Sequence, residues 1–487
     1  MDNKNVFSNM LWRFFERCGA QGVTLVVSVI LARLLDPSVY GTVALVTVFT
    51  TFLQVFVDSG LGNALIQKKD ADDVDFSTVF FFNIFMCTVL YICMYFAAPL
   101  IASFYNMPEL VPIVRVVSLM LVISGVKNVQ QAYVSKHMMF KKFFYSTIGG
   151  TIFAAIVGIA MAYLGFGVWA LVAQMLVNLA TGTVILWITI KWRPKFVFSF
   201  KRLKGLFSYG WKLLVSALLE TGYNDLRQLI IGKFYSRSDL AFFDKGKHFP
   251  SLIVTNVNSS IDSVLFPVMS SSQDDKDKVR AMTRRAIKTS TYIMFPLMIG
   301  LAVCSKSIVT ILLTEKWLPC VPFMIVYCIT YAFYPIHTAN LNAIKAMGRS
   351  DMFLKLEIIK KTIGILFVLV TMRHSVMAMA YSLIVTTFTS QIINAWPNKK
   401  LLNYSYIDQI KDMLPAMLIS AVMGIIVILV QFLNINVIFI LVIQVTLGGV
   451  IYIGLSKVFH LESFEYLLDF VKKLVKKKWL KNLMKNI

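Results

Sequence analysis

The segment MLPAMLISAVMGIIVILVQFL, residues 413–433, is separated by only two residues from NVIFILVIQVTLGGVIYIGLSK, residues 436–457. A helix needs about 20 apolar residues to cross the hydrocarbon core of a bilayer. Inside lipid, a chain can satisfy its backbone polar groups only as a helix or a closed barrel. Both segments are far longer than a tilted strand requires, so they predict two consecutive transmembrane helices.

Apolar stretches of this kind recur from one end of the chain to the other, broken by short loops. The predicted spans are residues 8–34, 38–66, 76–104, 109–133, 143–164, 167–190, 207–235, 240–270, 286–314, 319–347, 353–372, 375–397, 412–433 and 436–457. The sequence therefore predicts an all-α polytopic membrane protein with about 14 transmembrane helices.

The composition agrees with this class. Hydrophobic residues make up 57% of the chain and charged residues 15%, well below the roughly 25% that is typical of soluble domains. The formal net charge of +23 does not indicate nucleic-acid binding, because the excess of Lys and Arg lies in short loops between apolar spans, where it orients a membrane protein.

The distribution of loop charge predicts the orientation. Six basic residues lie within residues 191–204 and six within 276–288, with further lysines at Lys68–Lys69, Lys136–Lys142 and Lys399–Lys400. The loops 99–112, 163–168 and 434–437 contain no Lys or Arg. Because Lys and Arg are enriched on the cytoplasmic side, both termini are predicted to be cytoplasmic, as an even number of spans requires.

Short sequence patterns that occur twice indicate an internal duplication. Asp72-Asp73 with Asp75 recurs about 202 residues later as Asp274-Asp275 with Asp277, each time before an apolar span. Parallel repeats related by an axis along the membrane normal are a transporter architecture in which the halves enclose the substrate. We therefore predict two pseudo-symmetric six-helix lobes, residues 1–196 and 197–400, two additional transmembrane helices in 401–458, and a basic amphipathic cytoplasmic tail, 459–487, that lies on the anionic inner leaflet.

Polar residues recur at helical spacing in the first two spans of each predicted lobe, which places them on one face of each helix. They are Arg13, Arg17, Gln21, Thr24 and Ser28 in the first span, Gln54 and Asp58 in the second, Glu220, Asn224 and Arg227 in the seventh, and His248 and Asp262 in the eighth. Tyr223 adjoins the face of the seventh span, and Lys245 and Lys247 lie near the outer end of the eighth. A two-fold arrangement of the lobes would bring these four faces around one central cavity.

Two interpretations of these faces stay open. Polar side chains also hold membrane helices together, at roughly 0.6 kcal/mol per hydrogen bond, and Arg13 and Arg17 lie close enough to the cytoplasmic end to reach lipid phosphates. Ionisable groups within a span are costly and commonly face a pathway or one another. On that ground we predict that Asp58, Glu220 and Asp262 couple transport to an ion.

Neither a cofactor nor catalysis is predicted. The six cysteines are scattered without CxxC or zinc-like spacing, the five histidines are dispersed, and no GxxxxGK[ST] phosphate-binding loop occurs. The sequence therefore favours a transporter over an enzyme.

Several motifs resemble one family. The opening Trp12-Arg13-Phe14-Phe15-Glu16-Arg17, the stretch VILARLLDP at residues 29–37 with Tyr40-Gly41, and DSGLGNALIQ at residues 58–67 are similar to the start of Wzx-type polysaccharide exporters. The chain resembles, over its whole length, the colanic-acid-exporter-like branch of the multidrug/oligosaccharidyl-lipid/polysaccharide flippase superfamily. This family carries no strict catalytic signature, so the resemblance assigns no site residue.

The resemblance implies that undecaprenyl-diphosphate-linked sugar repeat units are moved from the cytoplasmic to the outer leaflet of the bacterial inner membrane. Expected partners are that lipid-linked oligosaccharide, membrane lipids, a polysaccharide polymerase and the chain-length machinery. A diphosphate needs cationic partners. We predict this role for Arg13, Arg17 and Arg227, supported by Lys245, Lys247 and His248, whereas Gln21, Gln54, Tyr223 and Asn224 suit sugar hydroxyls.

Two alternative functions are weighed against this one. A drug or cation antiporter of the same superfamily would share the architecture, but it would favour an acidic cavity rather than faces that contain arginine. A polysaccharide polymerase or ligase would be polytopic as well, but such enzymes carry a large outer loop with catalytic residues. Every predicted outer loop here is short.

Overall fold

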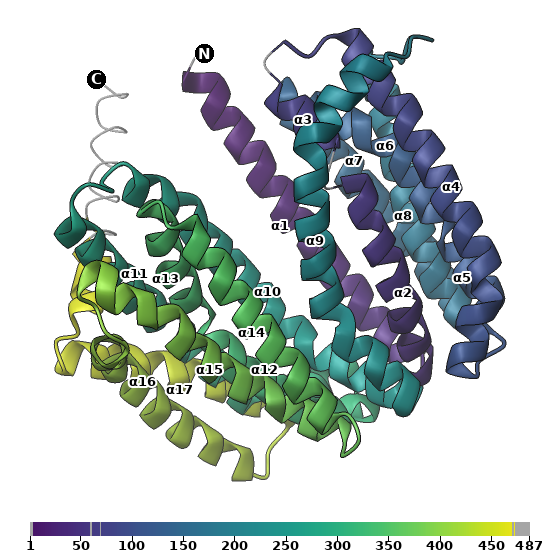
Figure 1. Ribbon diagram of the computed structural model, residues 1–487. Helices are drawn as coiled ribbons and strands as arrows, with labels where there is room; N and C mark the ends of the chain where they lie inside the picture. The colour runs from purple at the N-terminus through teal and green to yellow at the C-terminus, as the bar shows by residue number, and fades with distance from the viewer. Residues whose placement is uncertain (1–2, 59–60, 69, 470–471, 473–487) are drawn as a thin grey trace, which may run out of the picture. The chain divides into compact units, whose positions relative to one another are not determined.

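The computed structural model describes residues 3–58, 61–68, 70–469 and 472, and the regular elements among them are all helical (Figure 1). The helices form two compact units, unit 1 (Met1–Ala241) and unit 2 (Phe242–Ile487). The predicted all-α membrane fold is thereby confirmed. The division into lobes at residue 197 rests on the sequence repeat and stays a prediction, since the units are defined by packing.

Unit 1 is built from long helices that pack side by side. They are α1 (Asn3–Leu34), α2 (Pro37–Asp58), α3 (Leu61–Gln67), α4 (Asp73–Tyr105), α5 (Leu110–Val117), α6 (Leu119–Lys136), α7 (Phe140–Tyr163), α8 (Val168–Thr189) and α9 (Phe200–Phe234). Helix α7 packs against α1 and α8, α4 lies beside α5 and α6 along one side of the unit (Figure 1), and α9 packs against α2, α3 and α4.

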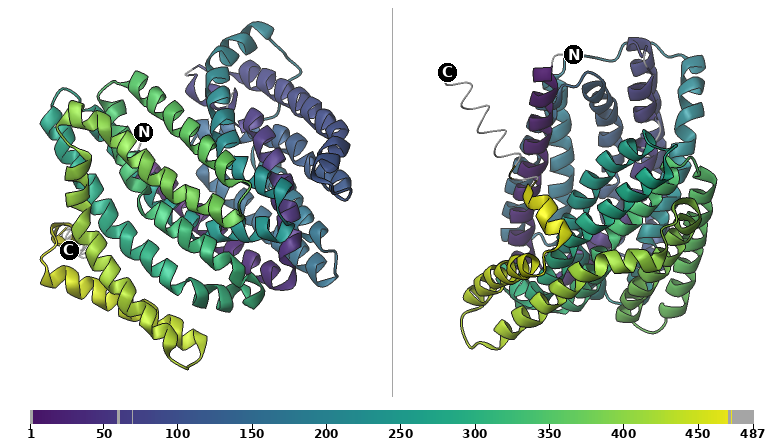
Figure 2. Two further views of the ribbon diagram at one scale, coloured as in Figure 1. Left: turned by 60° about the horizontal axis from the view of Figure 1, so that its bottom comes forward. Right: turned by 90° about the vertical axis from the view of Figure 1, so that its left-hand side faces the viewer.

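Unit 2 contains the remaining helices. They are α10 (Arg237–Ser270), which begins in unit 1, α11 (Lys276–Leu313), η1 (Glu315–Cys320), α12 (Val321–Ala332), α13 (Tyr334–Ala346), α14 (Ser350–Thr371), α15 (Val376–Leu402), α16 (Tyr406–Leu429), η2 (Val430–Phe432) and α17 (Val437–Val458). Helix α11 packs against α12, α16 and α17, and Figure 2 shows α16 and α17 side by side at one edge of this unit. A further helical stretch covers 462–469, and most of the predicted amphipathic tail lies outside the described residues.

Eleven helices or helix pairs within the described residues are long and apolar enough to cross a membrane. Helices α1, α9 and α14, with 32, 35 and 22 residues, are long enough but more polar. They carry Glu16, Glu220 and Glu357, for example, among several basic residues. The predicted count of 14 spans includes these three polar helices and stays a prediction.

The order of elements repeats along the chain. Apart from the short α3 in the first series and η1 in the second, two long helices are followed by a capped helix, a broken helix and two more helices. The first series is α1, α2, α4, α5–α6, α7 and α8, and the second is α9, α10, α11, α12–α13, α14 and α15. Asp72 caps α4 and Asp275 caps α11, each by accepting a backbone N–H bond from the helix. The two caps are 203 residues apart, one more than the repeated sequence pattern indicated, and this parallel supports the predicted duplication.

Two prolines inside helices leave backbone carbonyls that side chains from other helices satisfy. A proline has no N–H, so the carbonyl four residues before it loses its helical partner. Pro99 of α4 frees the carbonyl of Tyr95, which accepts from Arg115 Nε at 3.3 Å. In unit 2 the carbonyl of Tyr292, four residues before a proline of α11, accepts from Tyr452 Oη at 2.6 Å. These bonds keep kinked helices compatible with lipid, where an unsatisfied carbonyl is costly.

Helices α2 and α9 approach closely where α9 turns into α10. A Cβ atom at Gly41 would lie 1.8 Å from the carbonyl oxygen of Arg237, whereas a Cβ at Gly222 would meet only Phe52, at an ordinary 3.7 Å. Overpacking a tight contact costs about 1–3 kcal/mol. We therefore expect Gly41→Ala to lower the stability of the purified protein by about 2–3 kcal/mol, measured by thermal unfolding in detergent. Gly222→Ala is the matched control and should leave the unfolding temperature almost unchanged.

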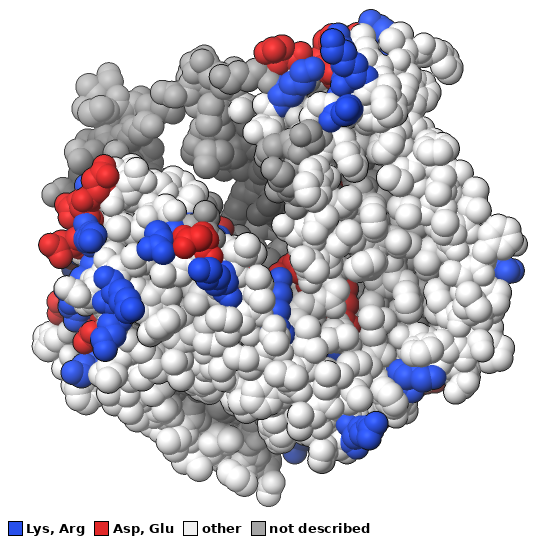
Figure 3. All heavy atoms as spheres, viewed as in Figure 1, with Lys and Arg blue, Asp and Glu red and all other residues white. Residues whose placement is uncertain are grey.

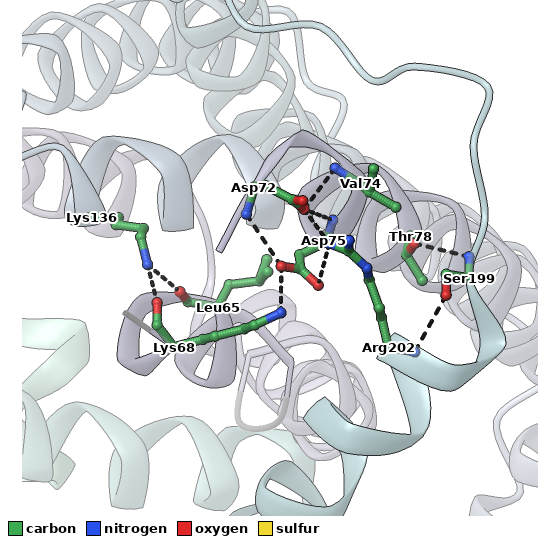
Figure 4. Close-up of polar contacts among 9 residues, drawn as sticks. All are labelled: Leu65, Lys68, Asp72, Val74, Asp75, Thr78, Lys136, Ser199 and Arg202. Carbon is green, nitrogen blue, oxygen red and sulfur yellow. Dashed lines mark hydrogen bonds and ion pairs between the residues drawn. The ribbon is translucent and has the colours of Figure 1, made fainter. Parts of the chain in front are cut away.

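A polar network ties the segment between α8 and α9 to the start of α4 (Figure 4). Asp72 and Asp75 form a capping box at the first turn of α4. The buried Asp75 carboxylate pairs with Lys68 Nζ at 2.6 Å and with Arg202 at 3.4 Å, and Arg202 also pairs with Asp72. In Figure 3 charged side chains gather at this end of unit 1, above a broad apolar surface.

The same connection is held by backbone and aromatic contacts. The backbone N–H of Lys195 donates to Ser77 Oγ at 3.0 Å, and that of Ser199 to Thr78 Oγ1 at 3.1 Å. Trp192 is buried and donates to Asp73 Oδ1 at 3.2 Å. These hydrogen bonds hold the segment between α8 and α9 against α4.

The Asp72–Arg202 pair makes a pH-dependent contribution to stability. The Arg202 guanidinium lowers the pKa of Asp72 to about 2, against about 3.9 for an unfolded aspartate. A depressed pKa stabilises the folded state above the unfolded pKa, and the contribution is lost as the pH falls toward 2. Asp72→Asn keeps a capping side chain but removes the charge. We expect it to lower the unfolding temperature slightly at pH 7, since the pair is half-exposed, and to match the wild type near pH 2.

Candidate functional site

Helices α2 and α9, which carry two of the predicted polar faces, pack against each other in unit 1. Glycine contacts give the register of this antiparallel pair: Gly232 lies against Leu45, and Gly222 lies against Phe52. Continuing this register places Gln54 and Glu220 at about the same level. Both residues were predicted to line a central cavity, and that role stays a prediction.

The predicted polar side chains of these two helices are mostly exposed and pair along their own helices. Gln54 Nε2 donates to Asp58 Oδ1 at 3.3 Å on α2, and Asn224 Nδ2 donates to Glu220 Oε1 at 3.1 Å on α9. Asp58, Glu220 and Asn224 are exposed, and Gln54 is half-buried. We call these four residues, with the half-buried Tyr223, the polar strip of unit 1. Amides, a phenol and carboxylates offer both donors and acceptors, which is the chemistry that sugar hydroxyls require.

Arg227 lies one helical turn beyond Asn224 on α9. Unlike the residues of the polar strip, it is buried. It is only 6% exposed, and its Nε and Nη2 atoms have no hydrogen-bond partner among the described residues. A buried charge without a partner is strongly destabilising, and a guanidinium presents N–H groups in a fork that matches phosphate oxygens. The arrangement at Arg227 therefore suits an anion, and a phosphate above all.

A second polar layer lies behind Asp58 and was missed by the sequence analysis. Asn128 Nδ2 of α6 donates to Asp58 Oδ1 at 3.3 Å, and Asn83 Nδ2 of α4 donates to Asn128 Oδ1 at 3.4 Å. A Cβ at Gly62 would lie 2.8 Å from Asn128 Oδ1, so a glycine there makes room for this contact. Lone amides inside apolar spans were the signal that could have found this layer.

Two charged residues accompany this layer. Glu16 of α1 is 7% exposed and accepts from Thr147 Oγ1 of α7 at 3.0 Å. Lys127 of α6 interacts electrostatically with both Asp58 and Glu16. A Cβ at Gly182 would lie 3.3 Å from Lys127 Nζ, so the ammonium rests in a recess beside α8. The Asp58 carboxylate therefore interacts electrostatically with the Lys127 ammonium inside unit 1.

The remaining predicted residues of the first span lie on α1. Gln21 is exposed on α1. Arg13 and Arg17 lie on the same helix, but their side chains lie outside the described residues. Their predicted role in binding a diphosphate stays a prediction.

In unit 2, the predicted residues occupy two separate places on α10. Lys245 is buried and its ammonium lies 5.6 Å from the ring centre of Trp317 in η1, with Lys247 and His248 half-buried nearby. Asp262 accepts from Asn342 Nδ2 of α13 at 2.8 Å. At 1.5 Å per residue, Lys245 and Asp262 are about 25 Å apart along the helix, so they cannot belong to one compact site.

A metal ion bound by side chains needs several His, Cys, Asp or Glu groups close together. No set of three or more His, Cys, Asp or Glu side chains there is arranged to hold a metal ion.

The family of this chain follows from its sequence match. Residues 30–322 match the family described as polysaccharide biosynthesis protein. The chain belongs to this family. The resemblance to polysaccharide exporters that the opening motifs indicated is thereby confirmed.

Two relatives are similar to this chain over most of their length. The teichuronic acid biosynthesis protein TuaB of Bacillus subtilis (strain 168) is 26% identical over 77% of this chain and 79% of that protein. The lipopolysaccharide biosynthesis protein WzxC of Escherichia coli (strain K12) is 23% identical over 83% of this chain and 85% of that protein.

The fold is that of a known flippase. The structure of the lipid II flippase MurJ in its inward closed conformation matches with a TM-score of 0.73 at 16% identity, covering 93% of this chain and 99% of that chain. At this identity the match establishes the fold alone. Together the family and the fold identify a multi-pass membrane protein of polysaccharide biosynthesis with the fold of a flippase.

Proposed function

We propose that this polysaccharide biosynthesis protein is a lipid-linked oligosaccharide flippase of the bacterial cytoplasmic membrane, with both termini in the cytoplasm. It moves undecaprenyl-diphosphate-linked repeat units from the cytoplasmic to the outer leaflet for polysaccharide or lipopolysaccharide assembly. The observation that carries this proposal is the buried Arg227 guanidinium, whose Nε and Nη2 atoms have no partner among the described residues.

The diphosphate and the sugars of this substrate each have a matching group of side chains in unit 1. The diphosphate binds Arg227 through charge-assisted, bidentate hydrogen bonds, and Arg13 and Arg17 of α1 add positive charge from the cytoplasmic end. The sugars bind the polar strip and Gln21. For Lys245, Lys247 and His248 of α10, a role in substrate binding stays a prediction from the sequence. The isoprenoid tail stays in lipid while the polar head passes through the protein by alternating access.

Two energy sources act on this substrate. With the inside negative, moving one negative charge outward is favoured by about 2.3 kcal/mol per 100 mV. Asp58, Glu220 and Asp262 add coupling to a proton or a sodium ion. For Asp58 this proposal is supported by its bond to Asn128 and by its electrostatic interaction with Lys127, because charges linked inside a span commonly serve proton and ion pathways.

The test is a lipid analysis of cells that lack this protein. Isoprenoid-linked sugars are extracted, and their position is determined with a membrane-impermeant glycan-labelling reagent. The proposal predicts complete repeat units stranded on the cytoplasmic face. Units that reach the outer face but stay unpolymerised would instead identify this protein as the polymerase, and would contradict the proposal.

A further inference from the structure

A groove between α4 and α5 lies on the surface of unit 1. It is lined by Tyr91 and Tyr95 of α4 and by Arg115, Val116 and Leu119 around the break between α5 and α6. Both walls belong to candidate membrane spans, and only 17% of the apolar window of α4 is buried inside the protein. The groove therefore opens toward lipid rather than toward the interior of unit 1.

Arg115 is an unusual residue for such a surface. It lies five residues after Leu110, the first residue of α5, or about 7–8 Å along the helix. A charged side chain at this depth is costly unless it reaches the headgroups or meets a partner. Within the part of the chain that the structure describes, no carboxylate forms an ion pair with Arg115.

The guanidinium is also held in place, unlike a side chain that extends freely toward water. Its central carbon lies 4.1 Å from the centre of the Tyr95 ring. Its Nε donates at 3.3 Å to the Tyr95 carbonyl, which is available because Pro99 cannot donate to it. These two contacts fix the plane of the guanidinium and leave the terminal Nη1 and Nη2 groups for another acceptor.

We propose that this groove binds the phosphate group of a membrane lipid through the Nη1 and Nη2 groups of Arg115. A planar guanidinium fork matches two phosphate oxygens, and lipids are the source of phosphate at a lipid-facing surface. Tyr91, Val116 and Leu119 form the apolar wall along which the attached hydrocarbon chain packs. This site is separate from Arg227 and does not depend on the proposed transport function.

The experiment places a photoreactive p-benzoyl-phenylalanine at Leu119, in the groove. A second full-length variant carries it at Ile156, an exposed residue of α7 in the same unit, as the matched control. Each protein is reconstituted in nanodiscs with equal amounts of phosphatidylglycerol and diacylglycerol, and with undecaprenyl diphosphate in a parallel arm. Mass spectrometry identifies the crosslinked lipid.

We expect phosphate-bearing lipids to be enriched about tenfold over diacylglycerol at position 119 and not at position 156. Arg115→Gln, which retains an N–H donor for the Tyr95 carbonyl, should abolish the enrichment without lowering the unfolding temperature. Arg115→Lys, which keeps the charge but not the fork, should retain part of it. The two arms distinguish a phospholipid from the isoprenoid diphosphate. Equal crosslinking of diacylglycerol in the wild type, or enrichment that survives Arg115→Gln, would overturn the proposal.

Discussion

Arg227→Gln is expected to slow transport of the lipid-linked oligosaccharide by about 100-fold, because truncating one partner of a buried charge pair costs about 2–5 kcal/mol. In the substrate-bound state, the charge pair consists of the Arg227 guanidinium and the diphosphate. Arg227→Lys keeps the charge as a single point without the fork, and we expect an intermediate loss of about tenfold. The measurement is the initial rate of translocation in proteoliposomes.

The same substitution should stabilise the substrate-free protein. Without substrate, Arg227 is a buried charge with unpartnered N–H groups, and neutralising it removes a desolvation cost of about 1–3 kcal/mol. A residue that only held helices together would give the opposite result, since its loss would lower the unfolding temperature. Stability sacrificed for function is the expected sign of a binding site.

Arg349→Gln is the matched control for Arg227→Gln. Arg349 is exposed and pairs with Asp351 at 3.1 Å, so its loss should change neither the transport rate nor the stability appreciably. A transport rate for Arg227→Gln within a factor of about two of the wild type, at equal amounts of folded protein, would contradict a role for Arg227 in substrate binding.

Asp58→Asn is expected to remove the dependence of transport on an ion gradient. Asn preserves the shape of the side chain and can still bond Gln54 and Asn128, but it cannot take up a proton or balance a cation. We expect the rate under a proton or sodium gradient to fall about tenfold and to become equal to the rate without a gradient. Proteoliposomes with imposed proton, sodium or potassium-diffusion gradients measure this directly.

Asp36→Asn, in the loop between α1 and α2, is the control for Asp58→Asn and should keep the gradient dependence. If Asp58→Asn leaves that dependence intact, Glu220→Gln and Asp262→Asn are added to it in the same chain. An unchanged rate and an unchanged ion dependence after all three carboxylates are neutralised would eliminate ion coupling through these residues.

The sequence predicted the helices well because a membrane span has a strong local signal. The predicted span 109–133 corresponds to α5 and α6, but the break between them at Ser118 was missed, since no proline or glycine marks it. The most polar helices, α1, α9 and α14, were correctly predicted to be helical because their apolar residues persist around the charged ones.

The site was only partly predictable, because helical spacing places residues on one helix and says nothing about the helix beside it. Gln54 and Glu220 were both selected, yet their common level follows from Gly222 packing on Phe52. The missed Asn128 and Lys127 belong to α6 and reach Asp58 of α2 across about 70 residues of sequence. Likewise, the bond from Arg115 to the carbonyl freed by Pro99 depends on a contact between α4 and α5.

Whether this protein moves a lipid-linked oligosaccharide across a bilayer is tested most directly with the purified chain in liposomes. The liposomes contain fluorescently labelled undecaprenyl-diphosphate oligosaccharide, and a membrane-impermeant quencher reports how much of it lies in the outer leaflet over time. Our account predicts that the wild type exchanges the label between leaflets, that protein-free liposomes do not, and that Arg227→Gln is close to the protein-free rate. Exchange at the protein-free rate with folded wild-type protein under an imposed membrane potential and ion gradient would contradict it.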